Sequence, residues 1–272
     1  MINDLRFLFL RNLYYKYVRA NRYPLYKRVK FDTEIQKLKG IHYGEKCFII
    51  GNGPSLTASD LSVIKENKIP SFAANSIYKM FDKTDWRPTY YVFQDQQIID
   101  GLAEKFYELS SFCKLMFVRR DSYFQLSREV RNKSNIMFPK VVMRIRKDRF
   151  YDFSDDLSKF SFDGCTVTYL MMQIAYYMGF KTIYLIGVDH NFPVSYDEND
   201  KIIVDNTMKL HCFKDEKSVV LNPSRALEAT YAYRSAEKFC REHGVIVINA
   251  TRGGKLEVFE RREFDKLMST NE

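Results

Sequence analysis

Phe48-Ile49-Ile50-Gly51-Asn52-Gly53-Pro54-Ser55-Leu56 is the stretch that decides the fold of this 272-residue chain. Its first part, together with Cys47, is a short apolar run of the kind that forms a fully buried parallel strand. Two glycines separated by one polar residue then break the run, and a helix start is expected within residues 57–61. A strand, a glycine-rich turn and a helix start in this order bring backbone N–H groups to a phosphate.

The turn differs from two common nucleotide-binding fingerprints. No third glycine follows at the dinucleotide spacing, and no Gly-Lys-Ser/Thr closes a P-loop. Two interpretations therefore stay open at this point: a phosphate-binding turn, or a tight connection between strand and helix that binds no ligand.

The composition predicts a folded protein with a large core. Hydrophobic residues make up 46% of the chain, with 22 Phe and 19 Tyr, so global disorder is excluded, and the length suits one generous α/β domain or two small ones. No apolar run reaches about 18 residues, so no transmembrane helix is expected, and Asp4 and Arg6 interrupt an N-terminal stretch that lacks signal-peptide features. Five scattered cysteines, none in a C-x-x-C pair, are typical of reduced thiols in a cytoplasm.

Positive charge is concentrated at the front of the chain. The net charge of +9 favours anionic partners, and residues 1–30 hold eight basic side chains against one acidic one, interleaved with Leu, Phe and Tyr. We expect residues 1–40 to form a basic amphipathic N-terminal arm, either lying in an anionic membrane interface or docked on the domain or a partner subunit. No nucleic-acid recognition motif is present, so no nucleic-acid partner is expected.

Strands and helices alternate along the rest of the chain. Strands are expected at residues 71–75, 90–95, 115–118, 136–138, 182–189 and 245–249, and helices at residues 167–178 and 224–243. This alternation predicts an α/β, Rossmann-like fold with a mainly parallel sheet and helices on both faces. We expect one catalytic domain over residues 41–272, with an irregular insertion at residues 119–160 and a lid insertion at about residues 190–222.

Polar residues follow the expected strands where each strand ends. They are Asn52, Asn75, Asp95, Asp189 with His190, and Asn249. Ligands of parallel sheets bind beyond the carboxyl ends of the strands, where these side chains are expected to meet. Several neutral amides with few carboxylates suit a nucleotide base, ribose and phosphate.

Motifs along the chain resemble those of two protein families. F-I-I-G-N-G-P-S-L at 48–56, F-A-A-N-S-I-Y at 72–78 and G-F-K-T-I-Y-L-I-G-V-D at 179–189 resemble bacterial lipooligosaccharide sialyltransferases, which use CMP-sialic acid. G-V-D-H-N-F at 187–192, L-H-C-F-K-D-E at 210–216 and I-N-A-T-R-G-G-K-L-E-V-F-E-R at 248–261 resemble bacterial surface-polysaccharide proteins related to the 6-hydroxymethylpterin pyrophosphokinase-like domain. Together the likeness covers residues 46–268.

The resemblance to the sialyltransferases implies roles for the matching residues. Phosphate and ribose binding would fall to Gly51, Asn52, Gly53 and Ser55, and Asn75 would reach the nucleotide. Further substrate-binding positions implied by the resemblance are Gln94, Asp95, Gly164, Thr166, Asp189 and Tyr196.

Two stretches that contain these positions depart from the family pattern. Gln94-Asp95 stands where the family has asparagine, and Gly164-Cys165-Thr166 replaces the Thr-Ser-Gly that opens the next helix. The replacement still offers N–H groups at a helix N-terminus. Tyr196 is the one tyrosine whose distance from Asp189 compares with that of the family's phosphate-binding lid tyrosines.

Two of the four histidines are candidate catalytic residues. His190 follows a buried strand at its carboxyl end, where base, substrate contact and structural roles stay open. His211 lies after the lid, in the region where the sialyltransferases place their catalytic histidine. An imidazole that titrates near neutrality can take the proton from an acceptor hydroxyl, so His211 is the expected general base. His42 and His243 are expected to be structural.

The expected activity is transfer of a sugar from a CMP-linked donor to a hydroxyl of a surface glycan or glycolipid. The chain contains no D-x-D pair, and the acidic run at residues 197–200 is typical of a solvated turn. Donors such as Tyr and Lys can stabilise a monophosphate leaving group, so no cofactor and no obligatory metal are expected.

Two other functions stay open. A pterin pyrophosphokinase-like transfer from Mg-ATP would need carboxylates, for which Asp95, Asp163 and Asp189 are the candidates. A non-catalytic basic binding module is the third interpretation. The expected location is the cytoplasm, peripheral on the inner face of a bacterial plasma membrane, and a homo-oligomer stays open.

Overall fold

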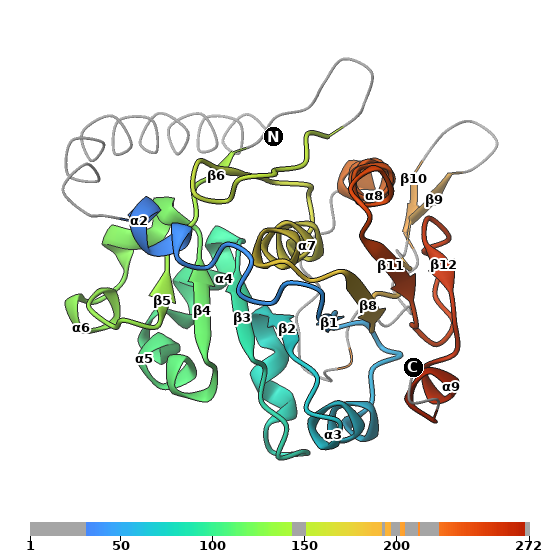
Figure 1. The fold of residues 1–272 in the computed structure, drawn as a ribbon, viewed down its shortest axis with the longest axis horizontal. Helices are drawn as coiled ribbons and strands as arrows, with labels where there is room; N and C mark the ends of the chain where they lie inside the picture. The colour runs from blue at the N-terminus through green and yellow to red at the C-terminus, as the bar shows by residue number, and fades with distance from the viewer. Residues whose placement is uncertain are drawn as a thin grey trace.

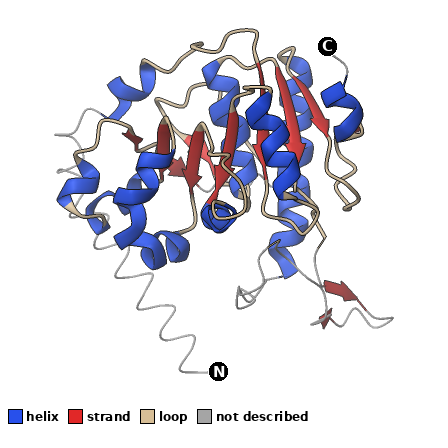
Figure 2. Ribbon diagram, turned by 90° about the horizontal axis from the view of Figure 1, so that it is seen from below, coloured by secondary structure: helices blue, strands red, loops and turns tan. Residues whose placement is uncertain are grey.

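The computed structural model describes residues 31–142, 151–191, 194–196, 202–204, 212 and 223–269. Their centre is an eight-stranded sheet in the order β12-β11-β8-β1-β2-β3-β4-β5, in which every neighbouring pair is parallel. Helices pack on both faces of this sheet (Figure 1), and the strands lie as a layer between them (Figure 2). The predicted Rossmann-like α/β fold is confirmed.

The elements have the following bounds. The strands of the central sheet are β1 Lys46–Ile50, β2 Ser71–Ala74, β3 Tyr90–Phe93, β4 Leu115–Val118, β5 Ile136–Met137, β8 Thr182–Ile186, β11 Ile246–Asn249 and β12 Glu260–Arg261. The helices are α2 Phe31–Gln36, α3 Ala58–Glu66, α4 Gln96–Leu102, α5 Phe106–Leu109, α6 Arg128–Arg131, α7 Val167–Met178, α8 Pro223–Glu242 and α9 Phe264–Ser269. Short 3₁₀ segments are η1 Asn75–Met80, η2 Ala103–Lys105, η3 Ser110–Phe112 and η4 Arg120–Gln125.

β1 shows why the sheet is buried on both faces. Cys47 and Ile49 belong to the core that also holds the inner faces of α7 and α8, whereas Phe48 and Ile50 belong to the core with α3, α5 and α9. All four side chains are fully buried. Because side chains alternate across a strand, two opposite cores require the uninterrupted apolar run that the sequence contains.

The helices next to β1 and β8 begin and end at the residues that the sequence indicates. Thr57 caps α3, accepting from the Asp60 N–H at 3.2 Å while the Asp60 carboxylate accepts from the Thr57 N–H at 3.0 Å, which is a complete capping box. α7 is capped by Thr166 and ends at Gly179, whose φ of +97° is the left-handed conformation that favours glycine.

The order of the strands creates a crevice beside β1. From β1 the chain adds β2, β3, β4 and β5 in one direction, whereas β8 and then β11 are added on the other side of β1. The chain therefore continues from β1 to β2 on one side and from β8 to β11 on the opposite side. Such a topological switch point leaves a crevice outside the carboxyl ends of the two strands, where ligands of open α/β sheets bind.

The predicted insertions contain small elements of their own. Within residues 119–160, η4, α6, β5 and the two-residue strand β6 Val141–Val142 are formed, and β6 pairs with β7 Ser161–Phe162. In the predicted lid, β9 Val194–Tyr196 and β10 Ile202–Val204 form an antiparallel pair.

The predicted N-terminal arm lies outside the described residues as far as residue 30. Its last part is α2, where Phe31 and Ile35 are buried in the two cores. Among the helices formed by described residues, none is long and apolar enough to cross a membrane.

Candidate active site

The turn after β1 and the turn after β8 lie against each other at the switch point. The Gly51 N–H donates to the Ile186 carbonyl and the Gly53 N–H to the Gly187 carbonyl, both at 2.8 Å. A Cβ at Gly51 would lie 2.2 Å from the Gly187 oxygen, and a Cβ at Gly53 would lie 1.8 Å from Asp189 Oδ2. Glycine is therefore required at both positions by the close approach of the two turns.

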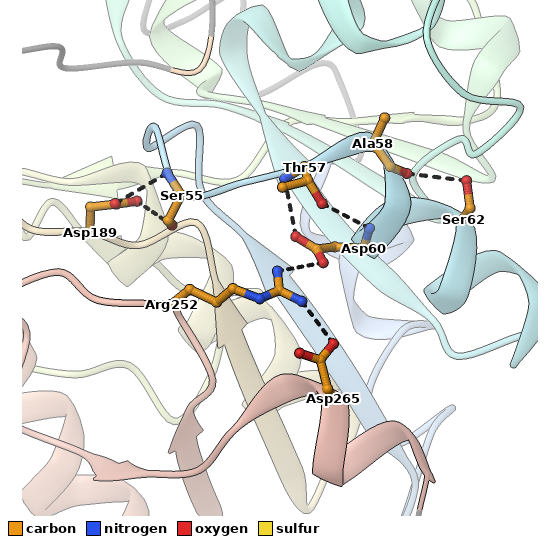
Figure 3. Close-up of polar contacts among 8 residues, drawn as sticks. All are labelled: Ser55, Thr57, Ala58, Asp60, Ser62, Asp189, Arg252 and Asp265. Carbon is orange, nitrogen blue, oxygen red and sulfur yellow. Dashed lines mark hydrogen bonds and ion pairs between the residues drawn. The ribbon is translucent and has the colours of Figure 1, made fainter.

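Asp189 joins the two turns through its carboxylate. Its Oδ1 accepts from the Ser55 N–H at 3.2 Å and its Oδ2 accepts from the Ser55 hydroxyl at 2.7 Å (Figure 3). Burial raises the pKa of Asp189, while the two bonds from Ser55 oppose that rise. The carboxylate is thus a buried acceptor that holds the end of the glycine turn.

A cavity of about 280 Å³ opens between these turns and two helices. One wall is the turn after β1 with the ends of β1 and β2, and a second is the turn after β8. The N-terminus of α7 and the inner face of α8 complete it. The lining residues are Ile50, Gly51, Asn52, Gly53, Ala74, Asn75, Cys165, Thr166, Val167, Thr168, Met171, Gly187, Val188, Asp189, His190, Asn191, Ala229 and Tyr233.

Three asparagines present buried acceptors at this cavity. Asn52 donates through Nδ2 to the Ala74 carbonyl at 3.1 Å, which leaves its Oδ1 as the remaining acceptor. Within the described part of the chain, Oδ1 of Asn52, Asn75 and Asn191 is buried and has no hydrogen-bond partner. Because buried polar atoms are normally paired, these oxygens suit a ligand that brings hydroxyl or amino donors.

The N-terminus of α7 forms another wall. Thr166 accepts from the Thr168 N–H at 3.3 Å, and Cys165 precedes it with a left-handed φ of +59°. The Cys165 N–H donates to Asp163 Oδ1 at 2.8 Å. The Asp163 carboxylate therefore stabilises the turn that leads into α7. The twelve-residue helix directs the positive end of its dipole at the cavity, which favours an anionic ligand.

His190 lies on the cavity wall with its imidazole held by α8. Its Nε2 is 2.7 Å from the Thr230 hydroxyl oxygen, and its ring packs edge-on against Tyr233 at 5.4 Å between centroids. Burial lowers the pKa of His190 to about 4, so the imidazole is neutral at pH 7. A neutral ring with so low a pKa is better suited to hydrogen bonding than to proton abstraction at neutral pH.

Most of the predicted substrate-binding residues meet in one place. The cavity lining includes Gly51, Asn52, Gly53, Asn75, Thr166, Asp189 and His190. Ser55 stands just behind it, bonded to Asp189.

Three predicted positions, Gln94, Asp95 and Gly164, do not line the cavity. Gln94 donates from Nε2 to Asp163 Oδ1 at 2.9 Å, and Asp95 caps α4 by accepting from the N–H groups of Gln97 and Ile98. Gly164 lies against the ring of Tyr169, where a Cβ would come within 2.5 Å. Their roles in substrate binding stay predictions.

Two predicted site residues, Tyr196 and His211, belong to the segment between β8 and α8. Tyr196 is the last residue of β9, and the structure describes only its backbone. His211 lies outside the described residues. Its neighbour in the sequence, Cys212, is described, and the Cys212 N–H donates to the Asn52 carbonyl at 2.9 Å. The chain therefore returns to the glycine turn directly after His211.

The cavity contains residues that sequence reasoning missed. They include Val167, Thr168, Met171, Asn191, Ala229 and Tyr233. Helical spacing marks the apolar face of α8 but does not tell which part of that face covers the sheet and which part faces a cavity. Only Asn191 carried a usable signal, as a third polar residue after a buried strand.

The carboxylates considered for magnesium each bind protein groups. Asp95 caps α4, Asp163 accepts from Cys165 and Gln94, and Asp189 accepts from Ser55. Within the described ranges, no group of three His, Cys, Asp or Glu side chains is placed to hold a metal ion.

The fold and the cavity define a class: a Rossmann-like α/β protein with an amide-rich ligand site at its topological switch point. The sequence identifies the family within this class. Residues 23–195 match the family described as "6-hydroxymethylpterin diphosphokinase MptE-like", and the chain belongs to it. This confirms the resemblance to the pterin pyrophosphokinase-like group, although the match includes only the first of the three motifs that suggested it, G-V-D-H-N-F at 187–192, and ends before the other two.

A solved structure shares the fold. It is the MAf glycosyltransferase from Magnetospirillum magneticum AMB-1, with a TM-score of 0.51 and 14% sequence identity over 86% of this chain. This chain spans 39% of that chain, and the likeness is one of fold. No curated protein sequence matches the chain.

Proposed function

We propose that this protein is a sialyltransferase-like glycosyltransferase that transfers a sugar from a CMP-linked donor to a hydroxyl of a surface glycan or glycolipid. The observation that carries the proposal is the composition of the switch-point cavity. Its polar lining includes three asparagine amides, a glycine turn and a helix N-terminus, with Asp189 as the one carboxylate among the described lining residues. The fold likeness to a glycosyltransferase is in keeping with this.

The cavity suits each part of a nucleoside monophosphate. Hydroxyls of a ribose and the amino group of a cytosine are donors that would satisfy the buried oxygens of Asn52, Asn75 and Asn191. The N-terminus of α7 and the glycine turn offer backbone N–H groups and a favourable dipole to a phosphate.

The state of Asp189 favours a monophosphate donor over Mg-ATP. Both of its oxygens already accept hydrogen bonds from Ser55. Magnesium in phosphoryl-transfer sites is bound by one or two carboxylates together with substrate phosphates. Because the Asp189 carboxylate already joins the two turns, it is poorly suited to binding Mg²⁺. Hydrogen-bond donors alone can stabilise CMP as it leaves.

The reaction needs a base, for which we propose His211. As the acceptor oxygen forms its bond to the anomeric carbon, the bond from that carbon to the CMP phosphate oxygen breaks, and the hydroxyl proton passes to the imidazole. The hydrogen bond from the Cys212 N–H to Asn52 supports this assignment, because it brings His211's neighbour in sequence to the glycine turn. The low pKa of His190 argues for a substrate contact at that residue.

A second candidate is favoured by the family itself. Its description names a diphosphokinase, which transfers diphosphate from Mg-ATP. The two candidates differ in the nucleotide released and in their need for a divalent cation.

A donor screen separates them. The purified chain is incubated with CMP-, UDP- and GDP-sugars and with ATP plus a pterin, with Mg²⁺ or with EDTA, and released nucleotides are resolved by chromatography. Release of CMP that is unaffected by EDTA is the expected result. Release of AMP that EDTA abolishes and Mg²⁺ restores would assign the diphosphokinase reaction instead.

We also propose that the basic arm brings the enzyme to the anionic inner face of the membrane, where a glycolipid acceptor would be available. The eight basic residues within residues 1–30 and their Leu, Phe and Tyr neighbours support it. Each basic residue near an anionic surface contributes about 1 kcal/mol of binding free energy.

A further inference from the structure

The loop after β11 packs behind the cavity. This TRGGK loop, residues 251–255, touches the backbone of the turn after β8 at three points. The Val188 N–H donates to Thr251 Oγ1 at 3.2 Å, and the Lys255 N–H donates to the Asp189 carbonyl at 2.7 Å. Gly254 has a φ of +76°, and a Cβ there would lie 2.7 Å from the same carbonyl oxygen. The loop therefore fixes the backbone that carries the Asp189 carboxylate.

Arg252 connects this loop to the helix that follows the glycine turn. One guanidinium nitrogen donates to Asp60 Oδ1 at 2.6 Å and the other to Asp265 Oδ1 at 2.9 Å (Figure 3). The second oxygen of Asp60 accepts from the Thr57 N–H, which places the ion pair on the first turn of α3. The guanidinium carbon also lies 5.3 Å from the ring centre of Phe264.

The bond to Asp60 is the stronger of the two. The Asp60 side chain is 5% exposed, whereas that of Asp265 is 79% exposed. A buried carboxylate depends on its cation, because removing the partner leaves an uncompensated charge in a poor solvent. An ion pair at an exposed carboxylate contributes little.

We infer that Arg252 is a positioning residue for the cavity: by tying the start of α3 to the TRGGK loop, it keeps the glycine turn and the Asp189 turn at the spacing that forms the site. Arg252 contacts both supports of the site. α3 follows the glycine turn that contains Ser55, and the TRGGK loop packs against the turn that carries Asp189. The inference rests on the proposed function only in taking a nucleotide as the ligand.

The first test needs no ligand. Hydrogen–deuterium exchange is followed in peptides that cover residues 51–57 and 187–190. In the first peptide, amides of the glycine turn donate to the end of β8 and the turn after it, and in the second the Val188 amide donates to Thr251 of the TRGGK loop. In Arg252→Gln these peptides should exchange about tenfold faster, the order of coupling between contacting residues. A peptide over residues 90–93 should be unchanged. The matched control is Arg241→Gln, which removes an exposed ion pair to Glu237 on the far part of α8.

Two further variants separate positioning from the cost of a buried charge. Asp60→Asn/Arg252→Gln leaves no unpaired buried charge but still lacks the tie, so its 51–57 and 187–190 peptides should exchange as fast as those of the single variant. Arg252→Lys keeps a cation that can reach Asp60, though without the forked geometry, and should recover most of the protection. Recovery in the double variant with none in Arg252→Lys would overturn the inference.

The second test measures affinity for CMP by calorimetry at a temperature where every variant is folded. Arg252→Gln and the double variant should bind about tenfold more weakly, which corresponds to coupling of about 1.4 kcal/mol. Asp265→Asn and Arg241→Gln should match the wild type. If the wild type binds no CMP, the proposed donor is wrong, while exchange still decides the positioning role. Unchanged exchange at both turns in Arg252→Gln would refute that role whatever the ligand.

Discussion

Ser55 and Asp189 are 134 residues apart in the sequence and are joined by two hydrogen bonds, one to each carboxylate oxygen. The pair closes the switch point between β1 and β8, so that two turns from distant parts of the chain behave as one wall. Gly53 makes this closure feasible, since any side chain there would occupy the place of Asp189 Oδ2. The close approach of the two turns therefore depends on Ser55, Gly53 and Asp189.

Replacing Gly53 tests this closeness. Gly53→Ala is expected to lower the free energy of unfolding by about 1–3 kcal/mol, the usual cost of overpacking, and to weaken nucleotide binding. Gly101→Ala is the control, because Gly101 lies in α4 with no atom within 4 Å of an added Cβ. That variant should gain roughly 0.5–1 kcal/mol from helix propensity. Urea denaturation measures both, and equal effects would contradict the packing described.

The acceptor oxygen of Asn52 leads to a second expectation. Asn52→Ala should bind CMP about tenfold more weakly, since the hydrogen bond from the ligand to Oδ1 is lost, together with the bond from Nδ2 to the Ala74 carbonyl. Asn67→Ala removes an exposed asparagine that bonds the Val63 carbonyl at the end of α3. It should bind as the wild type does. Titration calorimetry that found equal affinities in the two variants would exclude Asn52 from the nucleotide site.

Turnover should depend on His211. General-base catalysis contributes about 10²–10⁴-fold, so His211→Ala is expected to reduce kcat by that factor with donor affinity nearly unchanged. The acidic limb of the pH–rate profile should vanish in this variant. His190→Asn should retain the limb and raise the KM for the donor. The reverse pattern would transfer the role of base to His190.

Stability should fall in mild acid because of His190. Its pKa is lowered from 6.5 to about 4 by burial, so between these values the unfolded chain binds a proton that the folded protein does not. The contribution to the free energy of unfolding is complete above pH 6.5. It declines as the pH falls to about 4, by roughly 3 kcal/mol at most.

His190→Asn isolates this contribution. Asparagine accepts the left-handed φ of +49° found at position 190 and can still bond Thr230. The neighbouring Asp189 titrates in both proteins, so the difference between their stability curves reports His190. Parallel curves for wild type and variant from pH 7 to pH 4 would show that the imidazole titrates alike in folded and unfolded chains.

Membrane binding should follow the charge of the arm. Replacing its eight basic residues with glutamine is expected to abolish sedimentation with vesicles that contain anionic phospholipid, at low salt, because each charge contributes about 1 kcal/mol. Vesicles of neutral phosphatidylcholine serve as the control and should bind neither protein. Equal sedimentation of the two proteins with anionic vesicles would rule out an electrostatic role for the arm.

Sequence reasoning reached the parts of the site that are determined locally. The apolar run before Gly51, the helix start at Thr57 and the strand before Asp189 follow from residue type and spacing, and the alternation of strands and helices predicts the parallel sheet. The topology then brings Asn52, Asn75 and Asp189 to one edge without any further information.

The remainder depends on contacts between distant segments. Gln94 ends a strand as Asn75 does, yet its amide turns to Asp163, a partner 69 residues away. Arg252 carries no sign in the sequence that it pairs with Asp60, which lies 192 residues earlier. Tyr233 belongs to a helix whose apolar spacing is equally compatible with a closed core and with a cavity wall.

The central place of β1 has a consequence for synthesis of the protein. The partner of β1, β8, and the TRGGK loop follow β1 by more than a hundred residues, and Arg252 stands 192 residues beyond Asp60. At a translation rate of about 5–20 residues per second, that separation amounts to roughly 10–40 s on the ribosome. For most of this time, until β8 is made, one edge of β1 is open for pairing with another chain. A nucleotide cannot close this edge earlier, because its binding site also needs the turn after β8 and α8.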